Sequence, residues 1–241
     1  MSLMAQEDEG RVRPSPLRRL IPGGVKQALK RAWLEYKFSG AVRRIADLPP
    51  GSMPTRDMLE RLQAAWTNRG FVAKGDYLEE VARRAVETDG PILECGSGLT
   101  TILVGLLAGR RGVVTWSLEH MPVWHARVRE RVKRYGIRGV HVCLSPLREY
   151  GGFSWYDPPA EMLPGEFKLV ICDGPPESTP GGRYGLLPVL GDRLQAGALI
   201  LLDDANRPSE TEVLRRWGAE ADISVEMRER PTGTFALVTR R

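Results

Sequence analysis

Cysteine and histidine are both scarce in this chain of 241 residues, which contains three of each. Cys95, Cys143 and Cys172 each lie at the end of an apolar run, as small buried side chains do in a reducing compartment. This pattern does not indicate a disulfide framework, and the spacing matches no zinc-binding motif. With so few histidines, we do not expect a metal site built on imidazole ligands either.

Long apolar runs are absent as well. None approaches the roughly 20 residues that span a bilayer, and the polar, acidic start lacks the pattern of a signal peptide. We therefore expect a cytoplasmic protein. An apolar fraction of 42% and a charged fraction of 27% are ordinary for a globular chain, and the length suits one large domain with an appendage.

Acidic residues are scarce in one segment only. Residues 11–44 contain ten Lys/Arg and a single acid, Glu35. The excess of five positive charges in residues 1–50 equals the net charge of the whole chain, so the remainder is balanced. The basic character therefore belongs to the N-terminal segment.

Three parts follow from these patterns and from the Pro-Pro-Gly break at 49–51. We predict a disordered tail at 1–16, a basic helical extension at 17–72 and a catalytic domain at 73–241. Apolar periodicity predicts helices over 25–38, 55–68 and 75–88, the second capped by Ser52 or Thr55.

After Gly90, short apolar strands alternate with helical patterns. This alternation predicts a doubly wound, Rossmann-like α/β fold whose seven-stranded, mostly parallel sheet is covered on both faces. The turn Glu-Arg-Pro-Thr-Gly at 229–233 predicts a final hairpin, and hence an antiparallel last strand and an antiparallel edge of the sheet. The predicted strands are 91–95, 113–118, 139–143, 167–173, 197–203, 222–227 and 233–239, and the predicted helices are 99–109, 122–135, 183–193 and 208–217.

The strongest chemical signal is Gly-Pro-Ile-Leu-Glu-Cys-Gly-Ser-Gly-Leu-Thr-Thr at 90–101. A strand ends in Glu94, a turn holds Gly96 and Gly98, and an apolar helix follows; α/β proteins present backbone N–H groups to nucleotide-like ligands in this way. The third glycine of a dinucleotide fingerprint is missing, because Thr101 stands in its place. The acid before the turn favours a ligand that carries positive charge.

Other polar residues follow the next strands, and ligands of a doubly wound sheet bind beyond these strand ends. Glu119 follows the second strand, where a carboxylate can accept hydrogen bonds from two ribose hydroxyls. Ser145, Pro146 and Leu147 follow the third and suit an adenine ring, although a plain strand-to-helix turn explains them equally well.

This set of residues resembles the class I S-adenosylmethionine-dependent methyltransferase family over about 73–241. The resemblance implies that Glu94 lies near the methionyl end of the cofactor and that Glu119 binds its ribose. The turn Gly96-Ser97-Gly98 would let the backbone approach. Two more contacts are predicted from position: Lys74 with the cofactor carboxylate, and His120 with the adenosine, unless His120 lies at a solvated rim.

Three acids follow the fourth and fifth strands: Asp173, Asp203 and Asp204. Neighbouring strands should bring them together near the transferable methyl, with Asp173 and Asp204 as catalytic residues. Clustered carboxylates suit a hard cation such as Mg²⁺, and the pattern is similar to that of metal-dependent O-methyltransferases. Some sugar-type members carry a second acid where Pro175 stands here. In the alternative interpretation, one Asp of the 203–204 pair caps the helix near Pro208 and the other faces solvent.

Arg183 and Tyr184 follow a glycine-rich loop at 178–182 and either grip the substrate or belong to an ordinary helix start. The Tyr-Asp-Pro-Pro stretch at 156–159 is similar to a motif of amino-directed nucleic-acid methyltransferases. It precedes the fourth strand instead of following it, and Ala160 replaces the stacking tyrosine. We interpret it as a proline-stiffened loop.

The sequence of the basic segment is compatible with more than one partner. Residues 17–44 could contact an anionic membrane surface, cover the catalytic domain or form a homodimer contact. We do not expect nucleic-acid binding, because the rest of the chain is neutral.

The sequence as a whole predicts a methyltransferase directed at oxygen on a small molecule or saccharide. Two alternatives are another transfer on the same fold, such as aminopropyl transfer, and a non-catalytic cofactor-binding module that acts through its basic arm.

Overall fold

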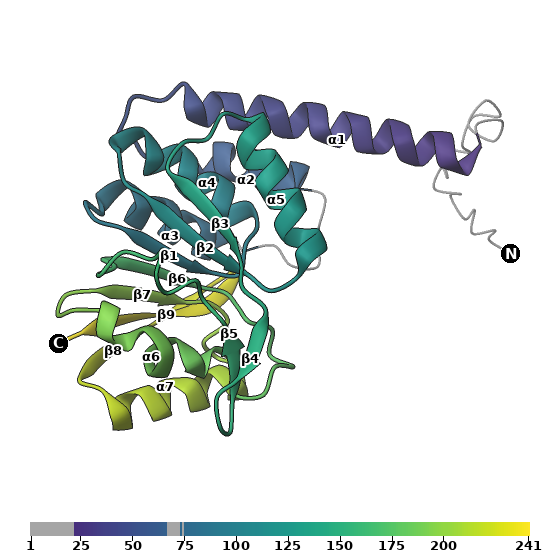
Figure 1. The fold of residues 1–241 in the computed structure, drawn as a ribbon. Helices are drawn as coiled ribbons and strands as arrows, with labels where there is room; N and C mark the ends of the chain where they lie inside the picture. The colour runs from purple at the N-terminus through teal and green to yellow at the C-terminus, as the bar shows by residue number, and fades with distance from the viewer. Residues whose placement is uncertain (1–21, 67–72, 74) are drawn as a thin grey trace, which may run out of the picture.

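A mixed sheet of seven strands runs through the computed structural model (Figure 1), which describes residues 22–66, 73 and 75–241. The strand order is β3-β2-β1-β6-β7-β9-β8, and all neighbours from β3 to β7 are parallel. The predicted doubly wound fold is confirmed. The strands are β1 (Ile92–Cys95), β2 (Thr115–Glu119), β3 (Val140–Leu144), β6 (Leu169–Cys172), β7 (Leu199–Leu202), β8 (Ile223–Arg230) and β9 (Gly233–Arg240).

The last strand is antiparallel and the final hairpin forms one edge of the sheet, as predicted. β9 lies between β7 and β8 and pairs antiparallel with both. The sheet edge is therefore formed by β8, the first strand of the hairpin. The inner place suits β9 because Phe235, Ala236, Leu237 and Val238 are all buried, a continuous apolar run that needs cover on both faces.

The strands that form the centre of the sheet are short and apolar. Every residue of β1 and β6 is buried, and β1 lies between β2 on one side and β6 on the other. The chain passes from β1 to β2 and β3 on one side of the sheet, and then crosses from β3 to β6 on the other side of β1. The crevice beyond the carboxyl ends of β1 and β6 is the topological switch point, where doubly wound sheets bind their ligands.

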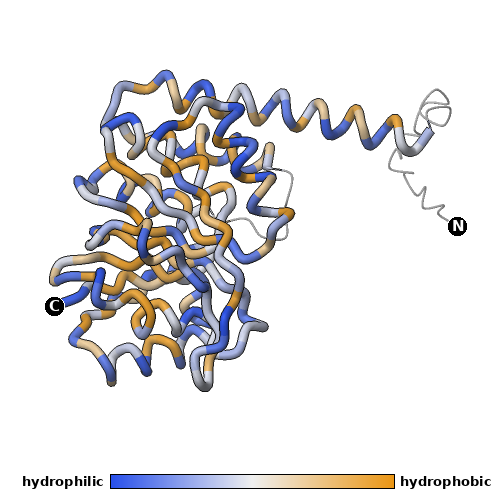
Figure 2. The backbone as a smooth tube through the Cα atoms, in the orientation of Figure 1, coloured by the Kyte–Doolittle hydropathy of each residue, from blue (hydrophilic) through white to orange (hydrophobic). Residues whose placement is uncertain are grey.

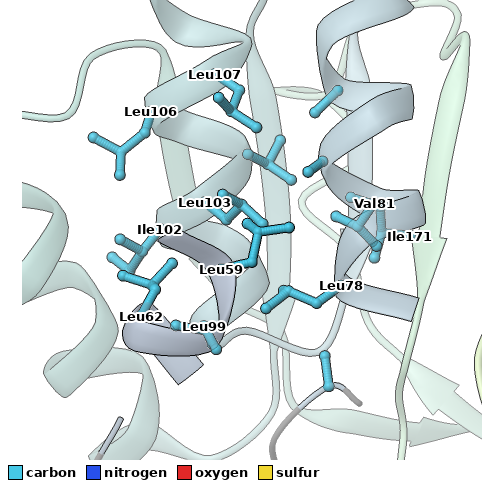
Figure 3. Close-up of a cluster of buried hydrophobic side chains, with 14 of the residues drawn as sticks. Leu59, Leu62, Leu78, Val81, Leu99, Ile102, Leu103, Leu106, Leu107 and Ile171 are labelled. Carbon is cyan, nitrogen blue, oxygen red and sulfur yellow. The ribbon is translucent and has the colours of Figure 1, made fainter. Parts of the chain in front are cut away.

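Five helices cover one face of the sheet and contribute to one apolar core (Figure 3). In α4 every residue is buried, because this helix lies between the sheet, α2 and α3. Leu103 of α4, Leu59 of α2 and Leu78 of α3 point into the same cluster (Figure 3). The five are α1 (Gly23–Ala46), α2 (Arg56–Ala65), α3 (Gly75–Glu87), α4 (Leu99–Leu107) and α5 (Pro122–Arg134).

The opposite face is covered by two helices and a small hairpin, which form a second core. The helix predicted at 183–193 is α6 (Leu186–Leu190) between the short 3₁₀ turns Gly182–Gly185 and Gly191–Arg193, and the helix α7 (Pro208–Glu220) follows β7. The hairpin joins β4 (Leu147–Glu149) and β5 (Ser154–Tyr156) in the crossover from β3 to β6. The sequence analysis did not predict this hairpin.

The N-terminal helix α1 is longer than predicted and only its second half packs on the domain. Phe38, Ala41, Val42 and Ile45 are buried in the first core, whereas residues 23–33 are exposed. Figure 1 shows this first half projecting beyond the body of the protein. Figure 2 shows that apolar residues recur along the projecting part.

Some predictions fall outside the described residues. These are the tail at 1–16, the start of the basic extension at 17–21 and the contact of Lys74 with the cofactor. Across the described ranges, no helix combines the length and apolar character needed to cross a membrane.

Candidate cofactor and acceptor site

The glycine turn after β1 lies against the loop after β6. Gly96 adopts φ +92°, which favours glycine, and a Cβ on it would lie 3.4 Å from the backbone nitrogen of Gly174. At Gly98 the surroundings differ, since nothing lies within 4 Å of the place that a Cβ would take. The turn is thus closely packed on one side and open on the other, as a backbone that receives a ligand must be.

Glu94 is fully buried beneath this turn. Its Oε2 accepts hydrogen bonds from Thr101 Oγ1 at 2.6 Å and from Ser117 Oγ at 2.5 Å. Its Oε1 has no hydrogen-bond partner and is also buried. Desolvation is the main reason that the pKa of Glu94 is raised to about 7, and the hydrogen bonds from Ser117 and Thr101 oppose the rise.

Thr101, which replaces the third glycine of a dinucleotide fingerprint, makes two hydrogen bonds in the turn. The Thr101 hydroxyl accepts a hydrogen bond from the Gly98 N–H at 2.8 Å while it donates to Glu94. Thr101 therefore caps the start of α4 and fixes the buried carboxyl group in one step. A glycine here would provide neither contact.

The raised pKa of Glu94 makes a prediction about stability. In the unfolded chain this pKa is near 4.5, so between pH 5 and 7 the folded state holds a proton that the unfolded state has lost. The free energy of unfolding must then fall as the pH rises through this window. Glu94→Gln has no charge to bury and should gain about 3 kcal/mol relative to wild type between pH 5 and pH 8.

Urea unfolding of both proteins at pH 5 and pH 8 measures this difference. Glu161→Gln, on the exposed surface, is the matched control and should show no such gain. An equal effect of Glu94→Gln at both pH values would contradict the assignment.

Glu119 ends β2 beside the same turn. Its Oε2 accepts hydrogen bonds from the Ser97 N–H at 3.2 Å and the Ser97 hydroxyl at 2.7 Å, and its Oε1 accepts one from the Met121 N–H. His120 Nδ1 lies 3.4 Å from Oε1. The backbone oxygen of Glu119 accepts a bond from the Ser145 N–H at 2.7 Å.

The structure thus brings most of the predicted cofactor residues together along β1, β2 and β3. Ser145 is buried, and Pro146 leads into Leu147, which begins β4 opposite Tyr156. The Ser145–Leu147 segment is therefore the start of a hairpin and not a turn into a helix.

The three predicted acids also meet. One carboxylate oxygen from each of Asp173, Asp203 and Asp204 lies within 4.8 Å of the others, the one such group of acid, Cys or His ligands in residues 22–66, 73 and 75–241. Asp173 follows β6, and its N–H donates to the Cys95 oxygen next to the glycine turn. The acid cluster therefore adjoins the turn across the switch point.

Two arginines offset part of the negative charge of this cluster. Arg183 is 3% exposed, and its Nη2 donates to Asp173 Oδ1 at 3.1 Å and to the Asp173 backbone oxygen at 3.0 Å, while its Nη1 donates to the Asp203 backbone oxygen. Arg207 forms an ion pair with Asp204 at 2.7 Å. Desolvation, followed by the charges of Asp173 and Asp204, raises the pKa of Asp203 to about 7 in spite of Arg183.

Arg183 and Tyr184 both make hydrogen bonds within the protein. Arg183 lies beneath the acids, as described, and Tyr184 is buried with its hydroxyl donating to Glu220 at 2.7 Å. Arg216 covers the tyrosine ring at 3.2 Å from its centroid. Both side chains are engaged within the protein, and their contact with substrate stays a prediction.

In the alternative interpretation, one Asp of the 203–204 pair caps α7 and the other faces solvent, and the structure shows neither. The residue before α7 is Arg207, and α7 has no side-chain cap. Asp203 and Asp204 are 5% and 8% exposed, so neither faces solvent freely. Asp203 Oδ1 instead accepts from the Asp204 N–H at 2.8 Å, which holds the pair in a fixed turn.

Two features near the site were missed in the sequence. Tyr156 of β5 is buried with its hydroxyl unpaired, and a Cβ on Gly174 would lie 2.4 Å from that hydroxyl. A cavity of about 170 Å³ opens between the loop at 177–184 and α7. The signal for Tyr156 was the aromatic-rich stretch Phe-Ser-Trp-Tyr at 153–156, which follows two glycines and precedes Asp-Pro-Pro, as is typical of a hairpin strand.

Comparison with known proteins supports the fold. No family model matches the chain, and neither does any curated protein. A methyltransferase of Podospora anserina, solved with SAH bound, is 17% identical with a TM-score of 0.54 and covers 96% of this chain and 99% of its own. The precorrin-6y C5,15-methyltransferase of Geobacter metallireducens is 12% identical with a TM-score of 0.53, covering 73% of this chain and 93% of its own.

A third structure, the C-terminal domain of the precorrin-6Y C5,15-methyltransferase of Rhodobacter capsulatus, agrees with these two. It is 13% identical with a TM-score of 0.50 and covers 80% of this chain and 98% of its own. The chain therefore has the fold of the class I S-adenosylmethionine-dependent methyltransferases. At these identities the likeness concerns the fold.

Proposed function

We propose that this protein is an S-adenosylmethionine-dependent methyltransferase. The observation that carries the proposal is the meeting of an open glycine turn, an unpaired buried carboxyl oxygen and an acid cluster at one switch point. The glycine turn is open at Gly98, the unpaired carboxyl oxygen belongs to Glu94, and the acid cluster includes Asp173. Such convergent polar groups in a crevice of this fold define a ligand site.

The residues of the turn fit the proposed cofactor. Its ammonium and sulfonium groups are positive, and the buried Glu94 lies beneath the turn with one oxygen that lacks a partner. Gly98 leaves room for close approach of the ligand. Glu119 accepts bonds from Ser97 in this structure and can accept ribose hydroxyls in their place. When bound, the cofactor supplies an electrophilic methyl group.

The acid cluster supports oxygen as the acceptor atom. Asp173, whose side chain is 33% exposed, is the most accessible of the three acids and lies closest to the glycine turn. A carboxylate there can orient an acceptor hydroxyl and hold its proton. Asp173, Asp203 and Asp204 are also a suitable ligand set for Mg²⁺, which would lower the pKa of that hydroxyl. The acceptor we propose is a hydroxyl of a small molecule or saccharide.

The product released from the cofactor tests the reaction type. Incubation of the protein with S-adenosylmethionine and a panel of catechols and saccharides should release SAH, detected by mass spectrometry. Release of methylthioadenosine from the decarboxylated cofactor in the presence of a diamine would instead identify aminopropyl transfer. Binding of the cofactor with no product from any acceptor would favour a binding module.

The metal proposal has its own test. Adding 5 mM MgCl₂ should raise the melting temperature by a few degrees, since an ion that binds only the folded state stabilises it. Asp203→Asn should abolish this shift, because one of the three carboxylates is then neutral. SAH formation should fall in EDTA and return with Mg²⁺. No shift in wild type, together with activity unchanged in EDTA, would refute the metal.

A further inference from the structure

The projecting half of α1 carries an exposed apolar stripe. Val25, Leu29, Trp33 and Tyr36 are 48%, 59%, 54% and 78% exposed. Successive helical residues are rotated by about 100°, so these four lie within about 80° of one another around the helix. They therefore form one continuous strip three turns long, visible as recurring apolar colour along α1 in Figure 2.

This stripe faces away from the domain. The buried residues Phe38, Ala41, Val42 and Ile45 of the same helix are centred nearly opposite the stripe by the same rotation. Glu35 fixes this orientation, because its carboxylate accepts a hydrogen bond from the Tyr135 hydroxyl at 2.7 Å and pairs with Arg131 and Arg134. The catalytic domain cannot cover the stripe without α1 turning over.

The charge beside the stripe is positive throughout. Lys26 and Lys30 border the stripe on the projecting half by the same rotation, and residues 22–34 contain no acid. Lys37 lies 4.1 Å above the Trp33 ring. Long basic side chains at the border of an apolar strip are typical of helices that lie in a membrane interface, where they reach anionic headgroups.

From these observations we propose that the first half of α1 binds the surface of an anionic membrane, with Leu29 and Trp33 in the headgroup layer and Lys26 and Lys30 on the lipid charges. An anionic lipid surface explains both the exposed apolar stripe and the basic side chains beside it. A second copy of α1 would bring like charges together in either orientation, since Glu35 is already paired. Nucleic acid would use the charges but would leave Val25 and Leu29 exposed.

Vesicle sedimentation tests the proposal with the full chain. The protein should sediment with vesicles of 70% phosphatidylcholine and 30% phosphatidylserine in 100 mM NaCl. It should stay in the supernatant with phosphatidylcholine alone, and 500 mM NaCl should release it. Lys26→Glu with Lys30→Glu should reduce the bound fraction at least tenfold, and Leu29→Gln with Trp33→Gln should do so as well.

Two control variants match these changes elsewhere on the surface. Arg61→Glu with Arg215→Glu alters the same charge on α2 and α7, and Met162→Gln with Met227→Gln removes exposed apolar side chains from loop and edge. Both should bind like wild type, and all variants should keep their melting temperature because the positions are exposed.

Four results would overturn the proposal. The first is absence of binding to the anionic vesicles. The second is equal binding by the α1 variants and wild type. The third is a light-scattering mass of a dimer that the Leu29→Gln, Trp33→Gln variant converts to a monomer, which would identify a second copy as the occupant. Binding of a 20-nucleotide RNA in place of vesicles would likewise overturn it.

Discussion

Gly98→Val is expected to weaken binding of SAH strongly while the protein stays folded. A Cβ at Gly98 would meet no other atom within 4 Å, so the turn itself has room for the start of a side chain. The same space is where we place the cofactor. Overfilling a close contact costs about 1–3 kcal/mol, so the affinity should fall by about 5- to 150-fold.

The matched control is Gly218→Val on the exposed surface of α7, where a Cβ also meets nothing within 4 Å. It should bind SAH like wild type, and both variants should melt within a few degrees of wild type. Gly96→Val is a less useful test, since φ +92° strains any side chain there. Unchanged SAH affinity in Gly98→Val would place the cofactor elsewhere.

Asp204→Asn is expected to lower the rate of methyl transfer by about 100-fold or more and to leave SAH binding intact. The substitution keeps the size of the side chain and removes its negative charge. Asparagine tolerates the positive φ of +50° at this position, so the turn should form as before. The loss should appear in kcat for any acceptor that the wild type methylates.

Asp222→Asn, an exposed change of the same kind, should leave kcat unaltered. Calorimetric titration of Asp204→Asn with SAH distinguishes a role in cofactor binding from a role at the acceptor. An undiminished kcat would show that the acid cluster takes no part in the reaction, whereas weakened SAH binding would show that Asp204 belongs to the cofactor half.

The order of strands and helices could be predicted because each carries its own apolar period. All seven strands of the sheet lie within a few residues of their predicted ranges. The β4–β5 hairpin was missed because each of its strands has three residues, too few for a period to show. The place of β9 inside the sheet depends on pairing between distant strands, which no local pattern reports.

Much of the site could be predicted for a similar reason. In a parallel sheet the ends of neighbouring strands meet, so Glu94, Glu119, Asp173 and the 203–204 pair had to converge. The position of Arg183 could not be predicted, because a charged residue beside glycines looks exposed until the acids that it neutralises are placed around it. The two hydrogen bonds of Thr101, with Gly98 and Glu94, could not be predicted either, because the sequence shows only that a threonine replaces the third glycine.

Calorimetric titration of the wild-type protein with SAH tests the central claim most directly. We predict that one molecule binds each chain and that the melting temperature rises with the SAH concentration. Absence of heat and of any rise in melting temperature, for both SAH and S-adenosylmethionine, would contradict the account.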